Sequence, residues 1–156
     1  MTGASRAWVA LLSPYKSAAD LRAVYELAIT VIPFTALWAV MWWSLQFSYI
    51  LTLVLAVPTA GMMLRTFIIQ HDCGHGSLFT SRLVNDWVGR LMGLITLTPY
   101  DYWRHSHAMH HASSGNLDQR GFGDIDTLTV EEYQALGWPS RLRYRLYRHP
   151  VTMFAI

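Results

Sequence analysis

The chain has 156 residues, of which 53% are hydrophobic and only 14% are charged, and its formal net charge is +2. Ordinary soluble domains carry about 25% charged residues, so the composition excludes a typical soluble domain, a disordered segment and a coiled coil. The lone cysteine, Cys73, excludes an intramolecular disulfide and a zinc site built from cysteines. The class that remains is a membrane protein.

Residues 1–26 mix charged and apolar side chains and predict a short segment at the membrane interface. Residues 27–64 then contain no charged side chain over 38 positions. Because about 20 apolar residues cross a bilayer, this run predicts two transmembrane helices within residues 27–69. Gln46 and the serines Ser44 and Ser48 interrupt the run, so we expect the chain to fold back there.

Positive charges flank the expected hairpin and are absent from its turn. Lysine and arginine are enriched on the cytoplasmic side of membranes, so we expect both flanks, and a helical region over residues 70–150, to face the cytoplasm. The arginines cluster only at Arg141, Arg143, Arg145 and Arg148. Anionic lipid and nucleic acid are both candidate partners for this run. Its place beside apolar sequence favours the membrane surface, and we expect no nucleic-acid partner.

Apolar residues recur at helical spacing from Leu83 to Ile95, which predicts an amphipathic helix on the membrane surface or beneath the cytoplasmic region. Residues 113–126 are rich in glycine, serine, asparagine and aspartate and predict a loop. Thr129 and Glu132 have the spacing of a capping box at the start of a short helix. Residues 151–156 begin a further apolar segment.

Six of the seven histidines fall within residues 71–111, in the motifs HDCGH (71–75) and HSHAMHH (105–111). Residues four apart share one face of a helix, so His71 and His75 are expected to point to one spot, as are His107, His110 and His111. Imidazole suits iron, zinc, copper and nickel, and suits calcium or magnesium poorly. The two clusters therefore predict a metal centre, and so many histidines fit two ions better than one.

Other classes of metal site are open on this pattern. HDCGH has the two-histidine spacing of the zinc protease motif H-E-x-x-H, but Asp72 stands in place of the glutamate and would displace a general base. A zinc-dependent intramembrane protease would also leave the second cluster without a role. A haem protein needs two axial histidines and not five. These classes, and a histidine-rich module that binds metal or haem without catalysis, are the alternatives.

The motifs HDCGHGS (71–77) and WRHSHAMHH (103–111) resemble the first two histidine boxes of the integral-membrane fatty acid desaturases. The stretches HASSGNLDQRGFGDIDTLTVEEY (111–133) and YRLYRHP (144–150) resemble the Δ12, or omega-6, type of that family. The resemblance implies an all-α membrane fold in which a transmembrane hairpin precedes a cytoplasmic helical cap. It also implies two iron ions, O2 as co-substrate, an acyl-lipid, acyl-CoA or acyl-carrier substrate, and electrons from ferredoxin or a cytochrome b5-type donor.

The resemblance assigns the iron ligands residue by residue. They are His71 and His75 in the first box, and His107, His110 and His111 in the second. His105 lies outside the frame of the second box and, like Asp72, is expected to orient a ligand without touching the metal. His149 matches no box and is expected to be structural.

The family also has a third box, H-x-x-H-H, after a second pair of spans, and no H-x-x-H-H sequence follows HAMHH (107–111) in these 156 residues. We therefore expect the chain to correspond to the N-terminal half of a desaturase, with the C-terminal half missing, and the fragment alone to be inactive and to bind iron poorly. The nearest alternative enzyme is a di-iron hydroxylase, acetylenase or ketolase of the same superfamily, because these enzymes share the boxes.

Overall fold

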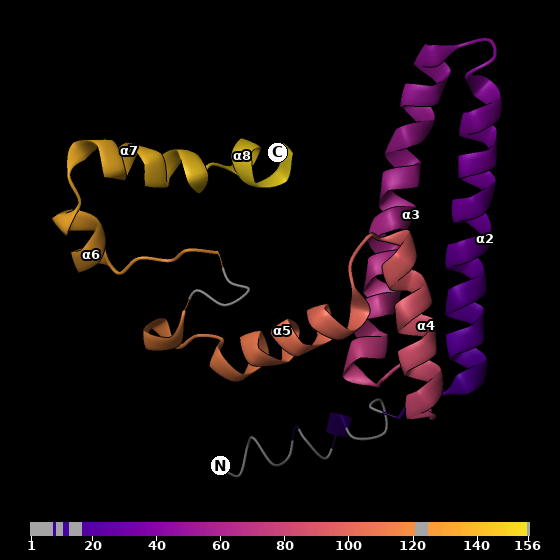
Figure 1. The fold of residues 1–156 in the computed structure, drawn as a ribbon, viewed down its shortest axis with the longest axis horizontal. Helices are drawn as coiled ribbons and strands as arrows, with labels where there is room; N and C mark the ends of the chain where they lie inside the picture. Colours follow the sequence, from indigo (N-terminus) through magenta and orange to yellow (C-terminus); the bar gives the residue numbers. More distant parts are fainter. Residues whose placement is uncertain (1–7, 9–10, 13–16, 121–124, 156) are drawn as a thin grey trace. The chain divides into compact units, whose positions relative to one another are not determined.

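The computed structural model describes residues 8, 11–12, 17–120 and 125–155, and every regular element among them is helical (Figure 1). The elements are α2 (Asp20–Ser44), α3 (Tyr49–His75), α4 (Arg82–Ile95), α5 (Tyr100–Ser113), the 3₁₀ turn η2 (Leu117–Gln119), α6 (Val130–Ala135), α7 (Trp138–Tyr147) and α8 (Pro150–Ala155). The all-α prediction is confirmed for these residues. Of the expected interfacial segment 1–26, residues 1–7, 9–10 and 13–16 lie outside the described part, and residues 20–26 form the first turns of α2.

Helices α2 and α3 lie side by side as an antiparallel hairpin (Figure 1). α2 ends at Ser44 and α3 begins at Tyr49, which confirms the predicted fold-back. The Ser48 hydroxyl accepts a hydrogen bond of 3.2 Å from the Leu51 amide and so caps α3. With 25 and 27 residues, both helices are long and apolar enough to cross a membrane. Only 11% and 22% of their most apolar stretches are buried inside the structure, unlike the core helices of a soluble protein.

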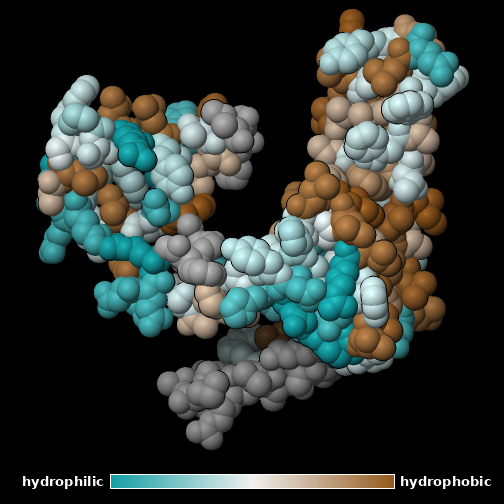
Figure 2. Space-filling view, viewed as in Figure 1, coloured by the Kyte–Doolittle hydropathy of each residue, from teal (hydrophilic) through white to brown (hydrophobic). Residues whose placement is uncertain are grey.

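The buried face of α3 is built from small side chains, most of them polar. Thr52, Thr59, Thr66 and Cys73 recur every seven residues, and none is more than 8% exposed. A seven-residue repeat keeps one row of side chains against a neighbouring helix, and small residues let membrane helices approach closely. Large apolar side chains of the hairpin are exposed, and Trp42 has 74% of its surface accessible. Figure 2 shows brown patches on the surface of the hairpin. This distribution suits a hairpin whose outer surface faces lipid.

Polar contacts join α2 to α3 at both ends of the hairpin. Near the turn, the hydroxyl oxygens of Ser44 and Thr52 are 2.6 Å apart. At the opposite end, Arg65 donates to the Glu26 carboxylate at 2.6 Å and to the Thr30 hydroxyl at 2.8 Å. Hydrogen bonds between membrane helices contribute about 0.6 kcal/mol each on average. The charged pair also leaves neither ion uncompensated beside an apolar span, where an unpaired charge would be far more costly.

Helix α4 confirms the predicted amphipathic helix and packs against α3 through its small and polar side. Its buried residues are Asn85, Gly89, Met92 and Gly93. The large apolar side chains on its other side, Leu83, Trp87, Leu91 and Leu94, are exposed. Helix packing in this part of the chain therefore relies on close backbone approach, and the apolar surface is directed away from the helical neighbours.

The chain divides into two units, within residues 1–106 and 107–156. In the second unit, the predicted capping box is confirmed. The Thr129 hydroxyl accepts from the Glu132 amide at 3.1 Å, and the Glu132 carboxylate accepts from the Thr129 amide at 2.7 Å. Arg120 donates to the same carboxylate at 2.9 Å and to the Thr127 carbonyl at 2.8 Å. The predicted loop 113–126 holds η2, and its residues 121–124 lie outside the described part.

The Arg120–Glu132 contact makes the order of α6 dependent on pH. The hydrogen bond from Arg120, and then that from the Thr129 backbone, lowers the pKa of Glu132 from 4.5 to about 2. A carboxyl group with a lowered pKa contributes stability that is present above pH 4.5 and is lost as the pH falls through 2. We expect amide hydrogens of α6 to exchange more slowly in the native chain than in the Glu132→Gln variant at pH 5. The ratio of the amide exchange rate in the variant to that in the native chain should fall to one near pH 2. A ratio of one at pH 5 would show that the Glu132 carboxylate does not stabilise α6.

Candidate metal centre

The first histidine motif lies on the last turn of α3, which continues from the second predicted span without a break. The Nε2 atoms of His71 and His75 are 3.2 Å apart, and their ring centroids are 4.5 Å apart. Gly76 ends the helix in the left-handed conformation, at φ 68°, which only glycine adopts without strain. The structure therefore places this pair on one helix face, as the four-residue spacing predicts.

Asp72 contacts the ring of His71 on the side away from His75. Its Oδ1 lies 3.1 Å from His71 Nδ1, whereas His71 Nε2 faces His75. A carboxylate that accepts from Nδ1 selects the tautomer in which Nε2 carries the lone pair, and it makes that nitrogen a stronger ligand. The Asp72 carboxylate thus lies beside His71 Nδ1, where it could orient the ring.

The second motif lies on α5 and repeats the same geometry. The Nε2 atoms of His107 and His111 are 3.0 Å apart, with ring centroids 4.5 Å apart. His110 stacks on His107 with its ring plane tilted by 21° and its centroid 6.0 Å away. The four-residue pair therefore directs its Nε2 atoms toward each other, whereas His110 contacts the pair through its ring face.

The donor set of the two pairs fits a transition metal. Two nitrogens that each lie about 2.1 Å from one ion are about 2.9 to 3.4 Å apart, and the distances of 3.2 and 3.0 Å fall within this range. Each pair by itself, His71 with His75 and His107 with His111, thus has the nitrogen spacing of two ligands of one ion.

The other two histidines lie outside the pairs. His105 is exposed on α5. The Nδ1 atom of His149 accepts from the Val151 amide at 3.3 Å, at the start of α8. This contact agrees with a structural role for His149.

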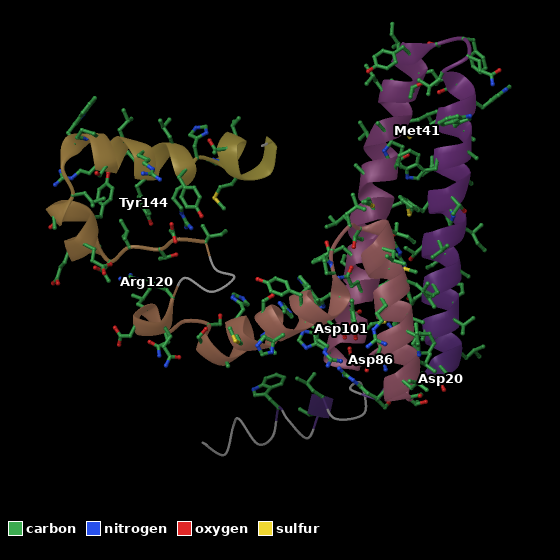
Figure 3. All side chains as sticks on the ribbon, in the orientation of Figure 1. Asp20, Met41, Asp86, Asp101, Arg120 and Tyr144 are labelled. Atoms are coloured by element: carbon green, nitrogen blue, oxygen red, sulfur yellow. The ribbon has the colours of Figure 1, made fainter. Side chains whose placement is uncertain are left out.

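Within the first unit, the start of α5 is held against the end of α3 by Tyr100. This side chain is 3% exposed, and its hydroxyl lies 3.0 Å from the Cys73 carbonyl and 3.0 Å from the Asp86 carboxylate. Arg104 donates to the same Asp86 oxygen at 2.8 Å. The Asp86 side chain is labelled in Figure 3. Burial, and then the hydrogen bond to Asp86, raises the pKa of Tyr100 to about 12, so its hydroxyl remains a proton donor at every physiological pH. The carboxylate thus joins α4 to the first two turns of α5.

Two glycines permit this close packing. A Cβ atom on Gly89 would lie 2.2 Å from the Tyr100 ring, and one on Gly74 would lie 2.8 Å from the Trp103 ring. Trp103 in turn lies against His71, with ring centroids 5.8 Å apart. The absence of side chains at the two glycines therefore sets how closely α5 approaches α4 and the end of α3.

Gln70 adds a polar anchor beside the first motif. It has no exposed surface, accepts from the Thr96 hydroxyl at 2.7 Å and donates to the Thr98 carbonyl at 3.4 Å. The sequence patterns do not point to Gln70, Asp86 or Tyr100. The one available signal was Gly89, because a glycine inside a helix costs about 1 kcal/mol and indicates a close contact.

Comparison with known proteins places this geometry in a family. The family model for "Fatty acid desaturase" matches residues 48–156. A fatty acid desaturase of Bacillus subtilis (strain 168) is 51% identical over 131 residues, which are 84% of this chain and 37% of the relative. An sn-1 acyl-lipid omega-3 desaturase (ferredoxin) of Synechocystis sp. is 38% identical over 94 residues, 56% of this chain and 25% of the relative. An acyl-lipid (9+3)-(E)-desaturase of Dimorphotheca sinuata is 30% identical over 144 residues, 79% of this chain and 34% of the relative. No solved structure matches the chain.

The chain spans between a quarter and about two fifths of the length of these relatives. The matched region begins at the turn of the hairpin and contains α3, both histidine pairs and the capping box. It covers more than half of the chain. The chain therefore belongs to the fatty acid desaturase family.

Proposed function

We propose that the chain works in a membrane enzyme that introduces a double bond at Δ12 into the acyl chain of a lipid. In this reaction the acyl chain loses two hydrogens, and O2 is reduced to two molecules of water with two electrons and two protons from outside. The proposal rests on two histidine pairs of similar geometry in a chain of the desaturase family. The Nε2 atoms are 3.2 Å apart in the first pair and 3.0 Å apart in the second.

The proposed metal ligands are His71 and His75 from α3, and His107, His110 and His111 from α5. Together they would hold two iron ions, which supply the activation of O2 when bound. The pairs converge in this proposal because α5 is one continuous helix, and Trp103, one turn before His107, lies against His71. Asp72 would fix the ring of His71, and His105 would act as a further orienting group.

Protein groups around the first pair would also keep water out. Cys73 has no exposed surface, Tyr100 covers its carbonyl, and Gln70 is fully buried on the same helix. The apolar outer surface of the hairpin offers an acyl chain a route from the bilayer to the end of α3. The start of α2 and the end of α3 are proposed to face the cytoplasm, because arginines lie there and the turn at residues 45–48 carries no positive charge.

The names of the relatives favour one substrate class and one electron donor. Three of them, from Synechocystis sp., Helianthus annuus and Nostoc sp., are described as acyl-lipid omega-3 desaturases (ferredoxin). We therefore propose an acyl-lipid substrate and a ferredoxin donor for this chain. An acyl-CoA substrate and a cytochrome b5-type donor remain predictions without such support.

Product analysis tests the proposal. The complete enzyme that carries this chain would be expressed in a host whose membrane lipids carry saturated and Δ9-unsaturated acyl chains. Gas chromatography with mass spectrometry would then locate any new functional group. A new double bond at carbon 12 is the expected result. A double bond at the omega-3 position would overturn the Δ12 assignment alone, and a hydroxyl or keto group would favour the hydroxylase or ketolase alternative. Stoichiometric zinc with proteolysis and unchanged lipids would favour the protease.

A further inference from the structure

The arginines of α7 and its C-terminal end differ from the other arginines in their partners. Five arginines elsewhere in the chain each pair with a carboxylate: Arg65, Arg82, Arg90, Arg104 and Arg120. Among the described residues, no carboxylate pairs with Arg141, Arg143, Arg145 or Arg148. Residues 133–156 contain no aspartate or glutamate at all. This segment therefore carries four positive charges that its own sequence does not neutralise.

One face of α7 is occupied by the rest of the second unit. Tyr144 accepts a hydrogen bond of 3.2 Å from the Leu128 amide and lies against the Tyr133 ring, with centroids 5.8 Å apart. Arg145 donates to the Tyr133 hydroxyl at 2.6 Å. Tyr147 accepts from the Asp126 amide at 3.4 Å. These contacts fix which side of α7 faces α6 and which side is left exposed.

The exposed side of α7 is an apolar stripe. Trp138, Leu142 and Leu146 are spaced by four residues, so they lie on one face of the helix, and they are 75%, 42% and 58% exposed. At 100° per residue, Arg145 and Arg143 fall on the two opposite flanks of this stripe. A stripe of tryptophan and leucine between arginines is the pattern of a helix that lies in the interface of a membrane.

We propose that α7 lies flat on an anionic bilayer surface, with Trp138, Leu142 and Leu146 inserted at the level of the lipid headgroups. The Arg143 side chain would reach past the stripe to the lipid phosphates, and its apolar stem would cover the inserted face. Arg145 would add positive charge from the other flank while it holds the Tyr133 hydroxyl. The exposed face of α7 is proposed to bind lipid and not an acidic protein, because the α2–α3 hairpin would tether the chain to a bilayer. The bilayer is thus present at a high effective concentration. The inference does not depend on the proposed metal chemistry.

The depth of two spin labels on α7 tests the proposal. Leu142→Cys places a nitroxide on the apolar stripe, and Ser140→Cys places a matched control about 160° around the same helix. Wild-type chain serves as the labelling blank, because Cys73 has no exposed surface. Each purified chain would be reconstituted into phosphatidylcholine vesicles and into vesicles of equimolar phosphatidylcholine and phosphatidylglycerol. Paramagnetic resonance would compare the accessibility of each label to O2 and to a water-soluble nickel complex.

In the anionic vesicles, we expect the label at residue 142 to favour O2 and the label at residue 140 to favour nickel. Replacing Arg143 with Gln should weaken the bilayer contact about fivefold, as for the loss of one interfacial arginine, and shift the residue 142 label toward nickel. Equal accessibility of the two labels in anionic vesicles would overturn the proposal. Burial of the residue 142 label only after an acidic electron donor is added would also overturn it, in favour of a protein partner. Circular dichroism of each variant checks that the helices are retained.

Discussion

Replacement of His71 by alanine should remove the bound iron and the desaturase activity of the enzyme that carries this chain. His71 is the residue at which the two proposed roles of the first motif meet: its Nε2 faces His75, and its Nδ1 lies 3.1 Å from Asp72. Loss of this ring removes one proposed ligand and leaves the Asp72 carboxylate without its imidazole. Replacing a group that merely supports a ligand costs about 10- to 100-fold in metal affinity, so loss of the ligand should exceed 100-fold.

The companion variants separate ligation from folding. Asp72→Asn should weaken iron binding within the range of about 10- to 100-fold, with helix content unchanged. His149→Asn is the matched control, since it removes a histidine outside the pairs and keeps an acceptor for the Val151 amide. Metal content by elemental analysis and product formation by mass spectrometry would be measured on each purified protein. Full iron occupancy in the His71→Ala protein would contradict the assignment, and so would loss of iron in the His149→Asn control.

Replacement of Gly89 by alanine should destabilise the fold, unlike the same replacement at Gly61. The new Cβ would lie 2.2 Å from the Tyr100 ring, which is itself buried and tied to Cys73 and Asp86. The ring cannot move away without breaking those hydrogen bonds. Overpacking of this kind costs about 1 to 3 kcal/mol, and the loss of one hydrogen bond adds about 1 kcal/mol.

Gly61→Ala is the matched control for this prediction. It makes the same substitution inside α3, and its Cβ would meet nothing within 4 Å. Because alanine is favoured over glycine in a helix by about 1 kcal/mol, Gly61→Ala should leave stability unchanged or raise it slightly. Thermal unfolding in detergent micelles, followed by circular dichroism, would compare both variants with the native chain. Equal melting temperatures for the two variants would show that the α4–α5 contact does not limit stability.

Sequence periodicity was sufficient for the features that depend on neighbouring residues. The absence of charge over residues 27–64 predicted the hairpin, and the serines at its centre predicted the turn between Ser44 and Tyr49. The four-residue spacing predicted that His71 and His75 share a helix face. These predictions hold because helix geometry relates residues a few positions apart in the same way in every helix.

Periodicity was weaker for the second motif and for the packing of α4. The spacing placed three histidines of α5 in one arc, whereas His107 and His111 approach through Nε2 and His110 stacks on His107. The apolar pattern of α4 predicted its amphipathic character correctly, but not that its small and polar side would pack against α3. Side-chain rotamers and the choice of packing face depend on neighbours that the pattern does not contain.

By itself, the sequence determined a membrane hairpin around the charge-free residues 27–64 and two histidine motifs, since these follow from composition and local spacing, and the family resemblance added the all-α fold. Only the tertiary structure decided that Tyr100 would bridge Cys73 and Asp86, and that Gly89 would make room for its ring. It also decided which arginines find a carboxylate and which face of α7 stays exposed. Such contacts join residues 11 to 39 positions apart, and they depend on the angle and distance between packed helices, which no local pattern specifies.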